Sequence, residues 1–283
     1  MAEHKVVLIT GATGGIGRAT AIAFAKTGQY DLALHYHACG QEARDALRST
    51  IESASPTSVL KVHFFQADLG SYDSVRKLHE DVTDTFNKVD VLFSNAGTTG
   101  GHTGVQSLAD VPIDIFEQTW RVNTGSAILL TQLCLPDMEE QEWGRIIFNS
   151  SVAAFTGGFV GPHYASSKSG QHGFVHWLAG NVAKKGVTVN AVAPALIADT
   201  AMVGDSDSSE VQKRMAESKF TSLCSLADAM MDIVRLPSLM YGTELPVGRL
   251  GRPEEIAETV LWMVNTPFVT NKVITVDGGM YPY

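Results

Sequence analysis

Short apolar runs that alternate with longer amphipathic stretches constrain the fold of this chain more than any other feature. The apolar runs have the length of β-strands, and the stretches between them have the length that crossovers between parallel strands require. This alternation predicts repeated βα units and a parallel sheet. The expected strands are Val6–Thr10, Leu32–Tyr36, Leu60–Ala67, Val89–Ser94, Arg145–Ser150, Val187–Val192 and Val273–Thr275.

The intervening stretches predict six helices, and with them a doubly wound α/β sheet that carries helices on both faces. In such a sheet the ligand crevice lies beyond the carboxyl ends of the strands. A length of 283 residues permits one domain or two, and the regular alternation favours a single domain over residues 1–283. The expected helices begin near Gly15, Glu42, Ser71, Ile115, His163 and Pro253.

Residues 203–247 interrupt the alternation. They contain no convincing strand, open with a polar run and then become helical and rich in methionine. We interpret them as a helical insertion over the crevice that acts as a substrate lid, and two helices that pack on the core are the alternative. Phe155 and Phe159 would form the opposite wall of the pocket, which predicts a bulky, largely apolar ketone as substrate.

Composition excludes several classes of function. With a net charge of −9 the chain offers no basic face for nucleic acid or an acidic membrane. No apolar run approaches the roughly 18 residues that span a bilayer, and the first residues lead into a strand without a signal-peptide core. We therefore expect a soluble, cytoplasmic protein.

A metal site is not expected either. Cys39, Cys134 and Cys224 lie far apart without CxxC spacing, which predicts neither a disulfide framework nor a zinc site. His172 and His176 are spaced i, i+4, but no third ligand accompanies them.

A glycine-rich turn follows the first strand and leads into an alanine-rich helix. Glycine permits a tight turn and a close approach of backbone to pyrophosphate, which the helix N-terminus can bind. The run from Thr10 to Gly17 resembles the TGxxxGxG pattern of the short-chain dehydrogenase/reductase family, with Gly11, Gly15 and Gly17 on its glycines. The resemblance extends from Lys5 to Gly279 and implies a Rossmann-type fold that binds NAD or NADP.

The same resemblance implies contacts at the ends of later strands: an adenine contact at Asp68 and Leu69, and carboxamide contacts near Ile197 and Thr200. The chain departs from the family pattern at Ser94, at Ala195 and at Asp199, which adds a residue before Thr200. The expected cofactor contacts are Gly11, Thr13, Gly15, Ile16, Gly17, Tyr36, His37, Asp68, Leu69, Asn95, Ala96, Gly97, Tyr164, Lys168, Pro194, Ile197 and Thr200.

The end of the second strand bears on the choice of cofactor. An acidic residue there binds the ribose 2′-hydroxyl of NAD and repels a 2′-phosphate. The chain has Tyr36 and His37 instead, which favours NADP over NAD, with His37 beside the phosphate. Gly14 argues the other way, because many NADP-using relatives carry a basic residue there.

Tyr164 and Lys168 place a phenol and an ammonium on one helix face. A tyrosine pKa near 10 suits proton transfer poorly at neutral pH, and a neighbouring cation lowers that pKa. By resemblance, Lys168 also binds the nicotinamide ribose, and Ser151 rather than Ser150 hydrogen-bonds the substrate oxygen. Asn123 resembles the helix asparagine that holds a water linking Lys168 to solvent.

These residues predict an NADP-dependent reduction of a ketone to an alcohol, in which Tyr164 protonates the oxygen; the reverse reaction uses the same groups. The resemblance is to the ketoacyl-reductase-like branch, and it implies a homo-oligomer. One alternative is an NAD-dependent alcohol or sugar dehydrogenase. A second is a non-catalytic dinucleotide sensor or scaffold, which would not need Asn123, Ser151, Tyr164 and Lys168 together.

Overall fold

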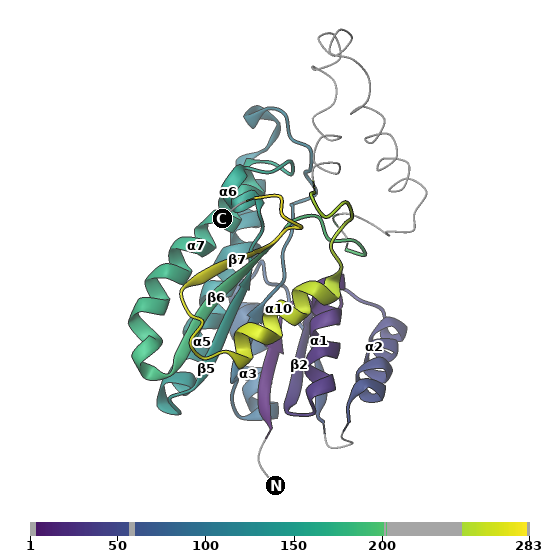
Figure 1. The fold of residues 1–283 in the computed structure, drawn as a ribbon, viewed down its shortest axis with the longest axis vertical. Helices are drawn as coiled ribbons and strands as arrows, with labels where there is room; N and C mark the ends of the chain where they lie inside the picture. The colour runs from purple at the N-terminus through teal and green to yellow at the C-terminus, as the bar shows by residue number, and fades with distance from the viewer. Residues whose placement is uncertain (1–3, 57–59, 201, 203–244, 282–283) are drawn as a thin grey trace.

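The computed structural model describes residues 4–56, 60–200, 202 and 245–281, which form one seven-stranded parallel sheet (Figure 1). The strand order is β3-β2-β1-β4-β5-β6-β7, so the predicted doubly wound parallel sheet is confirmed. The strands are β1 Lys5–Ile9, β2 Tyr30–Tyr36, β3 Val62–Gln66, β4 Val91–Ser94, β5 Gly144–Asn149, β6 Val187–Pro194 and β7 Lys272–Val276.

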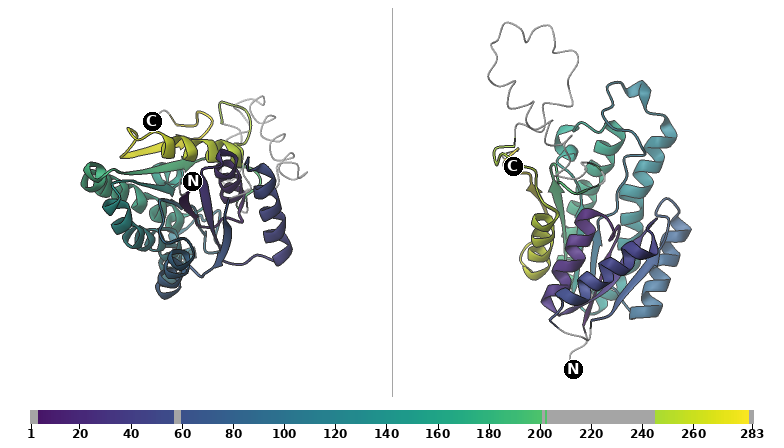
Figure 2. Two further views of the ribbon diagram at one scale, coloured as in Figure 1. Left: turned by 90° about the horizontal axis from the view of Figure 1, so that it is seen from below. Right: turned by 90° about the vertical axis from the view of Figure 1, so that its right-hand side faces the viewer.

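Helices cover both faces of the sheet (Figure 2). The α-helices are α1 Gly15–Thr27, α2 Gln41–Ala54, α3 Tyr72–Phe86, α4 Ile113–Trp120, α5 Ser126–Glu140, α6 Ala153–Thr156, α7 Pro162–Val182 and α10 Pro253–Asn265. Short turns of other helical types are η1 Leu108–Asp110, η2 Arg121–Gly125 and η3 Ala183–Lys185, of which η2 is a π-helical turn.

Side-chain alternation along the central strand divides the core into two layers. Val6 and Leu8 of β1 pack in a cluster with side chains of α3, α5 and α7, whereas Val7 and Ile9 pack with side chains of α1, α2 and α10. Successive strand residues point to opposite faces, so each face receives its own set of helices. The apolar runs read continuously in the sequence because both faces are buried.

The strand order reverses beside β1, which pairs with β2 on one side and with β4 on the other. The chain leaves β1 and β4 toward opposite sides, which opens a crevice at their carboxyl ends. The proposed lid lies almost entirely outside the described residues; of it, Leu245 is buried and Val247 is half-exposed. The lid therefore stays a prediction.

The segment before α10, which we expected to have a structural role, is organised by a carboxylate. Glu255 accepts hydrogen bonds from the Arg252 backbone N–H at 2.7 Å and from the Arg249 guanidinium at 2.6 Å. Pro253 occupies the first turn, where its missing N–H costs nothing. This arrangement fixes where α10 begins against α1.

The connection from α7 to β6 depends on Gly186, and this generates a stability prediction. Gly186 has φ +73°, and a Cβ there would collide with the carbonyl oxygen of Glu142. Gly186→Ala should therefore lower the free energy of unfolding by more than about 1 kcal/mol, measured by urea denaturation.

Gly180→Ala is the matched control, because no atom of the described residues lies within 4 Å of a Cβ built on this helical glycine. It should raise the free energy of unfolding by roughly 0.5–1 kcal/mol. Equal effects of the two substitutions would contradict the assignment of strain to Gly186.

Candidate active site

A cavity of about 710 Å³ opens at the carboxyl ends of the strands. It receives residues from the loops after β1 to β6, which is the crevice expected at the reversal of strand order. Its size and position fit a dinucleotide together with a small substrate. Of the predicted site residues, the following line it: Gly11, Thr13, Gly15, Ile16, Gly17, His37, Asp68, Leu69, Asn95, Ala96, Gly97, Ser151, Tyr164, Lys168, Pro194, Ile197 and Thr200.

The glycine turn brings backbone to the cavity wall. Gly11 has φ +62°, a conformation that favours glycine, and a Cβ on Gly17 would collide with the carbonyl oxygen of Gly11. No side chain of the described residues caps α1 at Gly14, so the first amides of this helix are available to an anion. The turn therefore fits a pyrophosphate.

A polar network joins the glycine turn after β1 to the ends of β4 and β5. The amides of Asn95 and Ala96 both donate to Thr10 Oγ1 at 2.9 Å, and Asn95 Nδ2 donates to the carbonyl oxygen of Thr10 at 2.8 Å. Asn149 Nδ2 in turn donates to Asn95 Oδ1 at 2.9 Å. The Asn95 side chain is thus used to hold the ends of β1, β4 and β5 together.

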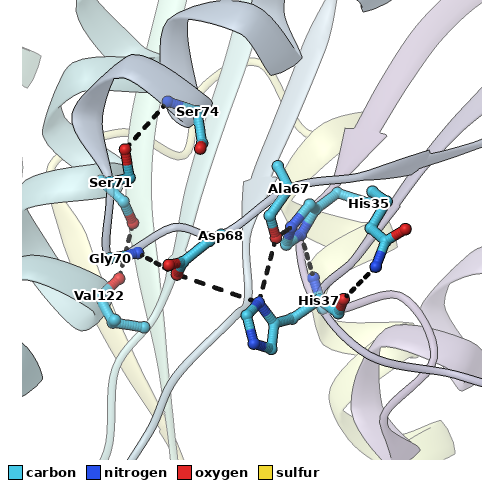
Figure 3. Close-up of polar contacts among 11 residues, drawn as sticks. His35, His37, Ala67, Asp68, Gly70, Ser71, Ser74 and Val122 are labelled. Carbon is cyan, nitrogen blue, oxygen red and sulfur yellow. Dashed lines mark hydrogen bonds and ion pairs between the residues drawn. The ribbon is translucent and has the colours of Figure 1, made fainter.

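The side chains of His35, Tyr36 and His37 at the end of β2 have different surroundings, and Figure 3 shows the two histidines beside Ala67 and Asp68. His35 lines the cavity and is buried, and His37 lines it from an exposed position with Nδ1 4.0 Å from Asp68 Oδ1. The ring of Tyr36 instead packs beneath the guanidinium of Arg44, 4.5 Å from the ring centroid, and does not line the cavity. At this strand end the cavity is thus lined by His37, as expected, and by His35, which the sequence analysis did not select, and not by Tyr36.

Tyr164 and Lys168 lie one turn apart on α7 and both are buried. Lys168 Nζ donates to the carbonyl oxygen of Asn149 at 2.5 Å and lies 5.8 Å from the centroid of the Tyr164 ring. Ser151 follows β5 and its hydroxyl accepts a hydrogen bond from the Ala153 amide at 3.1 Å. The structure thus brings Ser151, Tyr164 and Lys168 to one cavity.

Burial controls the protonation of this group. It raises the pKa of Tyr164 to about 12, although a hydrogen bond with Ser151 acts in the opposite direction. Burial likewise lowers the pKa of Lys168 to about 7. We expected Lys168 to lower the pKa of Tyr164, but the net shift of that pKa is upward, because desolvation by burial is its largest cause.

Asn123 lies behind the cavity wall, within the π-helical turn η2. Its Oδ1 accepts from the Thr98 amide at 2.7 Å, and its Nδ2 donates to the Thr98 carbonyl oxygen at 2.9 Å and to Ser167 Oγ at 3.0 Å. Gln171, which the sequence analysis did not select, donates to the Asn123 carbonyl oxygen at 2.6 Å. The asparagine side chain therefore holds the loop after β4 beside Lys168.

The loop after β6 closes the far end of the cavity. Pro194, Ile197 and Thr200 all line it, and Thr200 Oγ1 donates to the Ile197 carbonyl oxygen at 2.8 Å. Asp199 has φ +56° and its carbonyl oxygen lies against Gly15, where a Cβ would collide with it. The extra residue at Asp199 is thus accommodated without removing Thr200 from the cavity.

Apolar side chains line the cavity beside Ser151, Tyr164 and Lys168. Phe159 is among them, as expected, whereas Phe155 is not and packs on the ring of His172, 4.8 Å between centroids. Further apolar residues that the sequence analysis did not select also line the cavity, among them Val122, Val152, Val160, Leu196, Met202 and Met280.

The i, i+4 pair His172 and His176 on α7 has other partners. His172 Nε2 lies 2.7 Å from Ser150 Oγ, and His176 Nδ1 lies 2.6 Å from Asn271 Oδ1. Within the described part of the chain, no three His, Cys, Asp or Glu side chains gather as metal ligands would. In that same part, no helix is long and apolar enough to cross a membrane.

The burial of Lys168 predicts a pH-dependent cost to stability. Its pKa falls from the ordinary 10.5 to about 7 on folding, so between these values the unfolded chain binds more protons. Stability should therefore rise as pH increases from about 7 to about 10. Lys168→Met should be more stable than the wild type near pH 7, and each 1 kcal/mol gained should raise Tm by roughly 2–4 °C.

Thermal unfolding of the cofactor-free proteins at both ends of this pH range measures the effect. Lys61→Met, at an exposed lysine, is the control and should not change the pH profile. A Lys168→Met protein with the wild-type pH profile would show that Lys168 is not desolvated.

Known proteins resemble this chain over its whole length. The model of a family described as short chain dehydrogenase matches residues 5–211. The chain is 32% identical over 282 residues to the 3-oxoacyl-acyl-carrier-protein reductase FabG of Aquifex aeolicus, with 99% of this chain and 98% of the relative covered. It is 30% identical over 282 residues to an L-rhamnose 1-dehydrogenase (NAD(P)(+)) of Sphingomonas, covering 99% and 97%.

The crystal structure of levodione reductase matches the fold with a TM-score of 0.77 at 25% identity, covering 97% of this chain and 96% of that one. The family match and the similarity of the fold agree with one another. The chain belongs to the short-chain dehydrogenase/reductase family and has the NAD(P)-dependent oxidoreductase architecture of that family.

Proposed function

We propose that this protein reduces the carbonyl group of an apolar ketone to an alcohol with NADPH. One observation carries the proposal: the hydroxyl-bearing residues Ser151 and Tyr164 and the amine of Lys168 face the same cavity as the glycine turn. A hydride donor held at that turn and a proton donor on α7 therefore meet at one substrate. A sensor or scaffold would not need this second group of residues.

The cavity has features that a dinucleotide requires. The uncapped start of α1 and the close backbone at Gly11 and Gly17 suit the pyrophosphate, while Asp68 and Leu69 lie where the adenosine end would rest. Pro194, Ile197 and Thr200 would hold the nicotinamide end. When bound, the nicotinamide supplies or accepts the hydride.

The protein's own residues would handle the proton. Ser151 donates a hydrogen bond to the substrate oxygen, and Tyr164 transfers its phenolic proton to that oxygen as negative charge develops there. Lys168, already hydrogen-bonded to the Asn149 carbonyl oxygen, favours the phenolate that remains. Oxidation would use the same residues in reverse, and the water relay beside Asn123 remains part of this proposal.

NADP is favoured over NAD because no carboxylate occupies the end of β2. His37 lines the cavity there with an exposed side chain. A relative from Thermoplasma acidophilum, 31% identical over 282 residues, is named as an NADP(+)-dependent L-rhamnose 1-dehydrogenase, whereas the Sphingomonas relative is named for both cofactors.

Apolar lining near Tyr164 supports a ketone of the ketoacyl-reductase-like type, and FabG relatives act on 3-oxoacyl groups by name. The rhamnose dehydrogenases support the second candidate, oxidation of a sugar. We further propose that the protein is a cytoplasmic homo-oligomer and that residues 203–247 act as its substrate lid.

Tyr164→Phe should lower kcat by at least about a hundredfold, because general acid catalysis contributes roughly that much, and should leave the Kd for NADPH nearly unchanged. Lys168→Ala should lower kcat and also raise the Kd for NADPH. Tyr30→Phe removes the hydroxyl of another buried tyrosine and is the control. If Tyr164→Phe kept most of its kcat in a screen of ketones, the assigned proton donor would be wrong.

His37→Asp should move preference toward NADH, because a carboxylate at this cavity position repels a 2′-phosphate. We expect the ratio of the Kd values for NADPH and NADH to increase about tenfold or more, that is by about 1.4 kcal/mol. His63→Asp makes the same exchange at an exposed position of β3 and should leave the ratio unchanged. A wild-type protein that binds NADH tenfold more tightly than NADPH would reverse the choice of cofactor.

A further inference from the structure

We infer that His35 is a positioning residue of the dinucleotide site, because its imidazole ring joins the glycine turn after β1 to the end of β3. The inference rests on the proposed function, since it concerns the same cavity. His35 Nδ1 accepts a hydrogen bond from the Gly11 amide at 3.1 Å, and Nε2 lies 3.1 Å from the Ala67 carbonyl oxygen (Figure 3).

These two partners determine the form of the ring. A backbone N–H can only donate and a backbone carbonyl can only accept, so Nδ1 must be unprotonated and Nε2 must carry the hydrogen. The ring is therefore neutral and present as one tautomer. A second proton on Nδ1 would face the N–H of Gly11 and break that bond.

Burial keeps His35 in this neutral form. Only 1% of the residue is exposed, and burial lowers its pKa to about 4. The hydrogen bond to Ala67 acts against this shift, and the neighbouring His37 adds to it. The two bonds of the ring are consequently constant across the pH range in which a dinucleotide would bind.

The bond to Gly11 lies where small backbone movements affect the anion site. Gly11 begins the turn that leads to the first amides of α1, and it packs against Ala96 and Asn95. The carbonyl oxygen of His35 also accepts from the Ala12 amide at 2.8 Å, so one residue of β2 holds two successive amides of the turn. Loss of the imidazole would leave the Gly11 amide without this acceptor.

The bond to Ala67 lies at the other end of the cofactor region. Ala67 directly precedes Asp68 and Leu69, which line the cavity, and His37 Nδ1 also lies 3.3 Å from the Ala67 carbonyl oxygen. The bond to Ala67 therefore orients the ring so that Nδ1 meets the Gly11 amide, and the acceptor at Gly11 is the part of the ring that acts on the dinucleotide site. A histidine that only fills the core would affect stability without affecting the Gly11 amide.

Two polar substitutions separate the two bonds. The side-chain oxygen of His35→Asn lies two bonds from Cβ, as Nδ1 does, and can still accept from Gly11. The amide nitrogen of His35→Gln lies three bonds from Cβ, as Nε2 does, and can still donate to Ala67. His35→Leu replaces the imidazole with an apolar side chain of about the same bulk, which can form neither bond.

Fluorescence or calorimetric titration with NADPH and with NADH gives Kd for each protein. We expect His35→Leu and His35→Gln to raise Kd about tenfold, which corresponds to about 1.4 kcal/mol, and His35→Asn to stay within about threefold of the wild type. Turnover at saturating cofactor should change less than twofold in all three. His79→Leu, at a histidine of α3 whose pKa burial also lowers, should change Tm but not Kd.

Wild-type Kd in His35→Leu, or equal loss of affinity in the Asn and Gln variants, would overturn the inference and leave His35 as a core residue. If His35→Leu fails to fold, the Kd values of His35→Asn and His35→Gln still test the inference. Failure of the wild-type protein to bind either dinucleotide would instead refute the proposed function, so the two failures are distinguishable.

Discussion

The parallel pairing of β1 with β4 is the constraint on which the site depends. The strand order reverses here. The Thr10 hydroxyl joins the ends of the two strands, because it accepts hydrogen bonds from the backbone amides of both Asn95 and Ala96. Thr10 and Asn95 are thereby held at one level of the sheet. The glycine turn that follows Thr10 has a fixed starting point because of this junction.

From this junction, hydrogen bonds continue to Lys168 on α7. Asn95 Oδ1 accepts from Asn149 Nδ2, and the Asn149 carbonyl oxygen accepts from Lys168 Nζ. One network therefore reaches from the turn that would hold the pyrophosphate to the amine beside Tyr164. A buried network of this kind is effective only when its members are paired, which explains why polar side chains are concentrated at these strand ends.

The same burial that organises the site also makes it costly. Desolvation raises the pKa of Tyr164 and lowers the pKa of Lys168, so it favours the neutral forms of both side chains. His35 is a further neutral group in the same region, although its role is to hold backbone rather than to transfer a proton. The two apolar layers of the core offset the stability that desolvation costs at Tyr164 and Lys168.

The sequence by itself determined the seven-stranded parallel sheet, because buried strands and crossover helices have different lengths and periodicities. It also identified the glycine turn and the Tyr164 and Lys168 pair, whose spacing is local. Only the tertiary structure decided that Tyr36 faces Arg44 while His35 faces the cavity, since side-chain direction depends on register and packing across strands. It alone showed that burial controls the pKa values, because desolvation is contributed by segments distant in the chain.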